Sequence, residues 1–225
     1  CANREPRHVG TSSIGWPDDT VEVRLVDDTG ADAQQGELLV RAAGPDPRSG
    51  FFAGYFKNED ATSRVLKDGW LNTGDIGIYT YNDCLKIVGR SKDTIVLLNG
   101  ENLEPIPIEA KLCESPLIDQ CMIVGQDQKQ LGALVVPSLE GFANQGFSKE
   151  SVAVLAEDSE AHDRIVKEAK RLISNENGFK TFEHIHGIAL LPKPFEVGEE
   201  MTNTFKIKRH VVDEKYGDLI GWIFS

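Results

Sequence analysis

Hydrophobic and polar residues alternate along the first part of the chain in the pattern of half-buried β-strands. Residues 21–26 read VEVRLV and residues 36–41 read GELLVR. Asp27-Asp28-Thr29-Gly30 stands between them and is typical of a turn. The period of two and the turn sequence together predict an antiparallel hairpin.

A second hairpin and a short helix are predicted between these strands and residue 90. Residues 77–81 and 84–88 are rich in strand-forming side chains and flank Asn82-Asp83. Asn58 can accept a hydrogen bond from the first helical turn, so a helix is expected from there to Leu66. This part of the chain therefore reads as a small, mostly antiparallel β unit.

Strands and helices are interleaved in the rest of the chain. The predicted strands cover residues 94–98, 119–125, 131–137 and 184–191. The predicted helices cover residues 105–114, 148–156, 160–174 and 206–216. In the longest helix one face collects Ile165, Ala169, Leu172 and Ile173. The predicted fold class is α+β, with a small antiparallel β subdomain over residues 1–90 and a compact α/β domain over residues 91–225.

Composition narrows the function classes. The chain has 225 residues, 40% of them hydrophobic and 27% charged, which is ordinary for a globular protein. A formal net charge of −12 argues against a nucleic-acid partner, because phosphate binding requires clustered Lys and Arg. No apolar run reaches the roughly 20 residues that span a bilayer, and no signal peptide is visible, so a cytoplasmic location is expected.

The cysteines and the first residue add two expectations. Cys1, Cys84, Cys113 and Cys121 show neither a CxxC pair nor a metal-ligand spacing. Buried thiols in a reducing compartment are predicted, with a disulfide as the alternative. The chain begins with Cys1 rather than Met and without an opening signal for a helix or strand, which predicts a region upstream.

Two polar positions near the second hairpin are candidates for ligand binding. In Thr73-Gly74-Asp75 a carboxylate directly follows a glycine that permits a tight turn. Asp75 could accept hydrogen bonds from a ribose diol, or it could simply cap the turn. Arg90, one strand away, could reach a hydroxyl or a phosphate, or it could be a surface arginine.

Other candidates lie near the carboxyl terminus. Lys206 follows a proline-bearing loop, where its ammonium could neutralise a carboxylate or a phosphoryl group. The alternatives are a basic patch for a nucleic acid or a membrane, or a lysine solvated at the start of a helix. His184 and His186 alternate on a predicted strand and face one side, but they have no third partner, so no metal site is predicted. The chain contains no GxxxxGK[ST] loop and no Ser/His/Asp order of a catalytic triad.

The order of three motifs is more specific than any of them alone. GWLNTGD, then GRSKD with NGENLEPIPIE, then NTFKIKR resembles the carboxyl-terminal part of the AMP-forming adenylating enzymes. That superfamily contains acyl-CoA synthetases, adenylation domains of peptide synthetases and luciferases. The segments VGTSSIGWPDDTVEVRLVDDTG, GELLVR and GYF resemble the last β subdomain of the large amino-terminal domain. GENLEPIPIE and NTFKIKR favour the long-chain fatty acyl-CoA synthetase branch.

The resemblance implies a role for each candidate in adenylation. Asp75 would bind the ribose hydroxyls of ATP and of the acyl-adenylate, and Arg90 would assist at the same ribose. Lys206 would be the catalytic lysine that engages the substrate carboxylate and the α-phosphate. Residues 1–90 would be the incomplete last subdomain of the large domain, and residues 91–225 the mobile lid domain.

The resemblance also implies a second state for thioester formation. Lys92 would be the hinge about which the lid domain rotates. The turn that faces the pantetheine arm of CoA would be formed by Asn99, Gly100 and Glu101.

The implied reaction joins a fatty acid to CoA with ATP and Mg²⁺, all bound mainly by a large domain that would also make any peripheral membrane contact. The upstream phosphate-binding and adenine-binding segments are absent, and Phe205 replaces the glycine that usually precedes the catalytic lysine. The 225-residue chain by itself is therefore predicted to be inactive. Two alternatives stay open: an enzyme that loads an acyl carrier protein, and a non-catalytic binding module derived from the lid domain.

Overall fold

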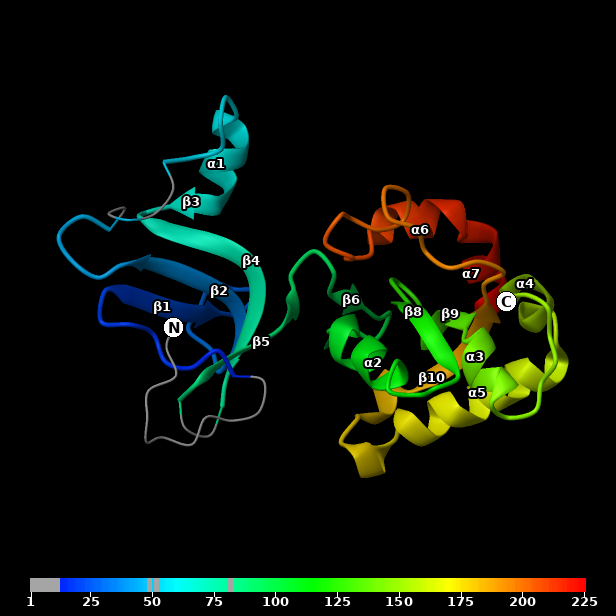
Figure 1. The fold of residues 1–225 in the computed structure, drawn as a ribbon. Coiled ribbons are helices and arrows are strands. Elements are labelled where there is room, and N and C mark those ends of the chain that lie inside the picture. Colours follow the sequence, from blue (N-terminus) through cyan, green and yellow to red (C-terminus); the bar gives the residue numbers. More distant parts are fainter. Residues whose placement is uncertain (1–12, 48–49, 51–52, 81–82) are drawn as a thin grey trace. The chain divides into compact units, whose positions relative to one another are not determined.

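The chain forms two compact units, Cys1–Lys92 and Asp93–Ser225 (Figure 1). The structure is a computed structural model, and it describes residues 13–47, 50, 53–80 and 83–225. Antiparallel sheet in the first unit and mixed sheet with helices in the second make the protein α+β, as predicted. That the first unit belongs to a larger adenylation domain stays a prediction.

The first unit contains a five-stranded antiparallel sheet in the order β1-β2-β4-β3, with β5 also paired to β4. Its strands are β1 (Val21–Val26), β2 (Gln35–Ala42), β3 (Leu66–Lys67), β4 (Trp70–Tyr79) and β5 (Leu85–Arg90). Both predicted hairpins are confirmed, while Tyr81 and Asn82 lie outside the described residues. Strand β3 was not predicted, although Asp68 and Gly69 have φ angles of 50° and 80° and form the two-residue turn that an Asp-Gly pair favours.

The turn predicted at Thr73-Gly74-Asp75 is wrong, because these residues lie inside β4. Glu37 of β2 pairs with Ile76, and Leu39 pairs with Asn72, so three residues of β4 bulge opposite a single residue of β2. The Thr73 hydroxyl donates to the Leu38 carbonyl at 2.9 Å, and Gly74 has a φ of 71°. The glycine therefore serves a bulge in a long strand rather than a chain reversal.

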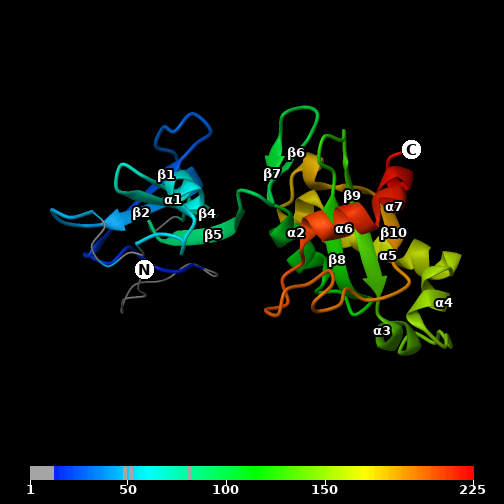
Figure 2. The same cartoon turned by 90° about the horizontal axis from the view of Figure 1, so that it is seen from above.

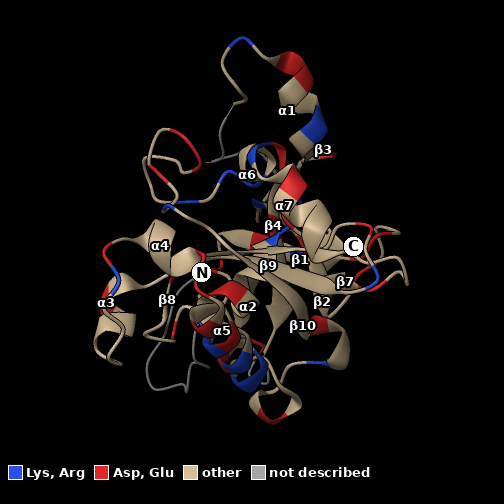
Figure 3. Cartoon of the chain, turned by 90° about the vertical axis from the view of Figure 1, so that its right-hand side faces the viewer, with Lys and Arg blue, Asp and Glu red and all other residues tan. Residues whose placement is uncertain are grey.

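Helix α1 (Glu59–Val65) begins where the sequence predicted it. The side chain of Asn58 accepts a hydrogen bond from the Ala61 amide at 2.9 Å. Acidic residues occupy the first turn and Arg64 the last, as the red and blue ends of α1 show in Figure 3. Both placements complement the helix dipole.

The second unit is built on a three-stranded sheet in the order β10-β9-β8. β8 (Ile118–Val124) is antiparallel and β10 (Ile185–Leu190) parallel to the central β9 (Leu131–Pro137). The helices are α2 (Pro105–Leu112), α3 (Leu139–Ala143), α4 (Val152–Ala156), α5 (Ser159–Leu172), α6 (Arg209–Lys215) and α7 (Gly217–Ile223). Helices α2 and α5 cover one face of the sheet, and α6 and α7 cover the other (Figure 1).

Strand β9 is buried on both faces, which explains its nearly continuous hydrophobic sequence. Alternate residues face opposite layers: Leu131, Ala133 and Val135 pack with the α5 side, whereas Leu134 and Val136 pack with the α6 side. The predicted apolar face of α5 is confirmed, since all four of its residues named above are buried.

Several boundaries in the second unit differ from the predictions. The helix expected over residues 206–216 begins at Arg209 and is followed by a separate helix, α7. The helix expected over residues 148–156 is limited to α4, and α3 was not predicted. The strand expected over residues 94–98 is a short hairpin of β6 (Ile95–Val96) and β7 (Asn102–Leu103).

The thiols are not all buried as predicted. Cys84 and Cys121 are buried, but Cys113 is exposed because it lies at the C-cap of α2, where the chain turns at the surface. None of these three cysteines forms a disulfide, and Cys1 lies outside the described residues. No helix in the described part of the chain is long and apolar enough to cross a membrane.

Candidate functional site

Asp75 and Arg90 are direct neighbours across the β4–β5 ladder. The Arg90 Nε lies 3.1 Å from the Asp75 Oδ1, and the two side chains are 52% and 25% exposed, respectively. The amide of Asp75 donates to the Thr73 hydroxyl at 3.1 Å, which holds the backbone of Asp75 at the end of the bulge. A carboxylate and a guanidinium held together at the surface offer an acceptor and a donor to the hydroxyls of a sugar.

A pocket of about 660 Å³ lies in the first unit between α1, the β4 bulge and the end of β5. The described residues that line it include the cations Arg64, Arg90 and Lys92 and no acidic residue. Asp75 does not line the pocket but contacts it through Arg90. Such a concentration of positive charge in an acidic chain favours an anionic ligand, and the volume suits a small molecule.

The β4 bulge is tied to the end of the first unit. The amide of Ser91 donates to the Gly74 carbonyl at 3.0 Å, and the Gly74 amide donates to the Asn72 side chain at 2.8 Å. Lys92 follows directly, is exposed and is the last residue of the first unit. Its role as a hinge stays a prediction.

Asn99, Gly100 and Glu101 form the tip of the β6–β7 hairpin in the second unit. The Gly100 amide donates to the Leu97 carbonyl at 2.9 Å, and the Leu97 amide donates to the Glu101 carbonyl at 3.0 Å. Gly100 has a φ of 83°, and a Cβ added there would meet nothing within 4 Å. The tip is therefore an exposed, glycine-dependent surface that another molecule can approach closely.

Lys206 is exposed and closes a tight hairpin loop over residues 202–206, outside any helix. The Phe205 amide donates to the Thr202 carbonyl, and the Thr202 amide donates to the Lys206 carbonyl, both at 2.9 Å. Phe205 has a φ of 59°, which is the left-handed position of a three-residue hairpin loop. Glycine is preferred at such a position, because it adopts a positive φ without steric strain.

The buried carboxylate of Glu200 stabilises the loop over residues 202–206. Glu200 is fully buried and forms an ion pair with Lys215 of α6, while its other oxygen accepts from the Glu196 amide at 3.0 Å. The Glu200 carbonyl accepts from the Lys208 amide at 2.7 Å. Burial tends to raise the pKa of Glu200, but the hydrogen bonds from Lys215 and the Glu196 amide outweigh it and lower the pKa to about 2. Glu200 is therefore charged at neutral pH and holds the loop against α6.

A second ion pair anchors the other side of the loop. Arg209 contacts the Glu109 carboxylate of α2, and each side chain is only 15% exposed. Arg209 also donates to the Ile123 carbonyl at 2.9 Å, and the Ile123 amide donates to Glu109 at 2.8 Å. The sequence alone indicated no role for Glu109 or Arg209, although they are the last residues of the motifs NGENLEPIPIE and NTFKIKR.

Figure 2 shows that the β6–β7 hairpin and the segment before α6 lie at opposite ends of this unit.

The two histidines lie together but without the partners of a metal site. His184 and His186 line a pocket of about 270 Å³ with Lys170 and Ser174. Among the described residues, no group of three or more His, Cys, Asp or Glu could hold a metal ion.

Comparison with known proteins identifies the class. Residues 92–224 match the family described as "AMP-binding enzyme C-terminal domain". The chain belongs to this family, and its resemblance to the carboxyl-terminal part of the AMP-forming adenylating enzymes is confirmed.

Relatives of the chain include long-chain fatty acid ligases. The chain is 34% identical over 226 residues to "Long-chain-fatty-acid--CoA ligase FadD15" of Mycobacterium tuberculosis, covering 96% of this chain and 34% of that protein. It is 32% identical to "Long-chain-fatty-acid--[acyl-carrier-protein] ligase AEE15, chloroplastic" of Arabidopsis thaliana, covering 95% and 29%, respectively. The chain thus spans about a third of the length of such relatives.

Solved structures share the fold. The adenylation domain of a carboxylate reductase from Mycobacterium chelonae matches with a TM-score of 0.74 and 23% identity, over 96% of this chain and 34% of that chain.

Proposed function

We propose that this chain is the carboxyl-terminal part of an AMP-forming ligase that activates a long-chain fatty acid with ATP and transfers the acyl group to CoA. The observation that carries the proposal is the exposed Lys206 on a hairpin loop that two largely buried ion pairs anchor. Membership of the family and the names of the long-chain relatives support it.

Lys206 acts in the first half-reaction. A carboxylate oxygen of the fatty acid attacks the α-phosphorus of ATP, and pyrophosphate leaves. Two anions must approach each other, and the ammonium of Lys206 offsets their repulsion and the charge that develops at the α-phosphate. Such a charge-stabilising group contributes about 10²–10³ in rate.

Asp75 and Arg90 bind the ribose of the nucleotide. Asp75 accepts hydrogen bonds from the sugar hydroxyls, Arg90 holds Asp75 in place, and the adjacent cationic pocket favours the polyphosphate. We assign none of the described residues to the binding of the Mg²⁺ that accompanies ATP.

The second half-reaction uses other residues. The CoA thiolate attacks the carbonyl carbon of the acyl-adenylate, a thioester forms and AMP leaves. The exposed hairpin tip at Gly100 accommodates the pantetheine arm, and Lys92 is the hinge between the two states.

The test separates the half-reactions in the full-length polypeptide that carries this chain. Lys206→Ala should lower ATP–pyrophosphate exchange by about 10²–10³ while leaving thioester formation from preformed acyl-adenylate nearly unchanged. The matched control is Lys167→Ala, which removes an exposed lysine of α5 and should leave both rates unchanged. Exchange that persists in Lys206→Ala would contradict the assignment. Turnover by the 225-residue chain alone would contradict its predicted inactivity.

A carrier protein is the second candidate acceptor, favoured by the similarity to the acyl-carrier-protein ligase named above. Preformed acyl-adenylate offered with CoA or with holo acyl carrier protein distinguishes the two. Thioester on the carrier protein alone would replace CoA in the proposal.

A further inference from the structure

Two thiols lie side by side where α2 turns into β8. Cys113 is exposed at the C-cap of α2, and Cys121 is buried in the middle of β8. Their Sγ atoms are 3.7 Å apart, and the Cys121 Sγ also contacts the Glu109 carbonyl at 3.6 Å. One sulfur therefore faces solvent while its neighbour lies beneath it.

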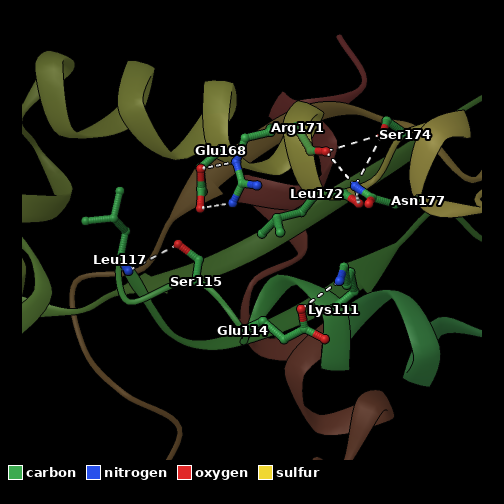
Figure 4. Close-up of polar contacts among 9 residues, drawn as sticks. All are labelled: Lys111, Glu114, Ser115, Leu117, Glu168, Arg171, Leu172, Ser174 and Asn177. Carbon is green, nitrogen blue, oxygen red and sulfur yellow. Dashed lines mark hydrogen bonds and ion pairs between the residues drawn. The ribbon is translucent and has the colours of Figure 1, made fainter.

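The chain between the two cysteines is held by its own hydrogen bonds. The Ser115 amide donates to the Leu112 carbonyl at 3.0 Å, and the Ser115 hydroxyl accepts from the Leu117 amide at 3.2 Å. Figure 4 shows this turn beside α5, where Arg171 pairs with Glu168 through two contacts of 2.8 and 3.0 Å. The fold itself keeps the thiols adjacent.

The environments of the two sulfurs differ in the way that a reactive and a resolving thiol require. The hydrogen bond with Cys121 lowers the pKa of Cys113, against opposing effects of burial and of the Glu109 carboxylate. The same hydrogen bond, together with burial, raises the pKa of Cys121 well above the usual range. Since the thiolate is the nucleophile, Cys113 is the sulfur that reacts first.

We propose that Cys113 and Cys121 are an oxidation site at which a peroxide converts two thiols into a disulfide. The Cys113 thiolate attacks a peroxide oxygen, the O–O bond breaks, and Cys113 becomes a sulfenic acid. The hydroxide released from hydrogen peroxide takes up the proton that Cys113 lost, which gives the first water. The Cys121 sulfur then displaces the sulfenic oxygen, which leaves with the Cys121 proton as the second water, so one peroxide is reduced and two thiols are oxidised.

Formation of the disulfide affects the Lys206 loop through Glu109. The sulfurs must close from 3.7 Å to the roughly 2.05 Å of a disulfide, and oxidation removes the Cys121 S–H that donates to the Glu109 carbonyl. Glu109 carries the ion pair with Arg209, three residues beyond Lys206. Oxidation therefore loosens one of the two anchors of the loop.

Mass spectrometry of the intact 225-residue chain tests the chemistry. Both cysteines fall in one tryptic peptide, residues 112–129, which should become two hydrogens lighter after hydrogen peroxide and regain them after reduction. Cleavage after Glu114 should leave the two pieces joined. A Cys1→Ser background removes the thiol outside the described residues, and buried Cys84 serves as an internal control that stays reduced. If both thiols stay open to alkylation after unfolding, the proposal is overturned.

Single variants test the order of reaction. Cys121→Ser should stop at a sulfenic acid on Cys113 that dimedone traps, whereas Cys113→Ser should leave Cys121 unmodified. Dimedone labelling of Cys121 in Cys113→Ser would overturn the assignment of Cys113 as the attacking thiol.

Hydrogen exchange tests the coupling. Amides of residues 206–209 should exchange about tenfold faster in the oxidised chain, and peroxide should have no such effect on Cys113→Ser. Unchanged exchange in a chain shown to carry the disulfide would overturn the coupling. None of these three readouts depends on ligase activity, so failure here leaves the proposed function untouched.

Discussion

The two units hold their candidate residues in different ways. In the first unit the hydrophobic cluster centres on Leu25, Leu38 and Leu85, and the site rests on a backbone bulge and a surface ion pair. In the second unit both faces of the sheet are covered, and the Lys206 loop is anchored by ion pairs that reach into the core. The difference indicates that the first unit offers a surface accessible to a ligand, whereas the second unit holds the Lys206 side chain in a fixed position.

The ion pairs show the same contrast. Asp75–Arg90 is partly exposed, so it contributes little to stability but can exchange its partners for a ligand. Glu200–Lys215 and Glu109–Arg209 each include a largely buried carboxylate, so removing the cation leaves that carboxylate without its ion-pair partner. The burial of the carboxylate therefore distinguishes an ion pair that stabilises the fold from one that can open for a ligand.

The largest expected effect concerns the cores. Leu134→Ala, at a fully buried position of β9, should destabilise the second unit by about 4 kcal/mol, and Leu38→Ala in the first unit should cost about 2 kcal/mol. Urea unfolding followed by helical circular dichroism reports mainly the second unit, which contains α2 to α7. Tryptophan fluorescence reports the first unit when it is measured in a Trp222→Phe background, which keeps Trp16 and Trp70. Equal losses would contradict the difference in packing.

Next comes the buried carboxylate. Glu200→Gln should destabilise the second unit by about 3 kcal/mol, because the neutral amide loses the contacts with Lys215 and the Glu196 amide that lower the pKa of Glu200 to about 2. The matched control is Glu199→Gln, which removes an exposed partner of the same lysine at 3.0 Å and should cost less than about 1 kcal/mol. Denaturant unfolding measures the loss of unfolding free energy in both variants. Equal losses would show that the burial of Glu200 does not contribute to stability.

The same carboxylate predicts a pH dependence. The pKa of Glu200 is lowered in the folded state from 4.5 to about 2, so its stabilising contribution is complete above pH 4.5 and is lost as the pH falls toward 2. The acid-induced loss of stability should therefore be smaller in Glu200→Gln than in the parent chain between these pH values. A parallel pH profile for the two proteins would be the contradicting result.

Asp75 should affect ligand binding more than stability. Asp75→Asn should weaken nucleotide binding to the full-length protein about tenfold, since the amide lacks one acceptor and the charge that fixes Arg90. Stability should change by less than about 1 kcal/mol. Asp32→Asn, which breaks the exposed pair with Arg24, is the matched control and should leave nucleotide affinity unchanged in a calorimetric titration.

The smallest effect is expected at Phe205. Phe205→Gly should stabilise the second unit by up to about 1 kcal/mol, because glycine adopts the φ of 59° without strain. Phe205→Ala is the control, since alanine removes the exposed ring but keeps the strained backbone. Thermal unfolding should place the glycine variant above both alanine and the parent, and the reverse order would show that the ring stabilises the loop.

The sequence by itself determined the local features. The alternation in residues 21–26, the cap by Asn58 and the apolar face of α5 were all readable, because each depends on neighbours a few positions away. The order of the motifs also identified the family, since that order is a property of the sequence alone.

Only the tertiary structure decided how the candidate residues are held. Gly74 signals a turn locally, but pairing with β2 on one side and β5 on the other stretches it into a bulged strand. Lys206 was expected to start a helix, yet Glu200 and Arg209 hold it on a hairpin loop. Arg209 and Glu109 are 100 residues apart, and no local pattern specifies a contact that forms only when α2, β8 and α6 pack together.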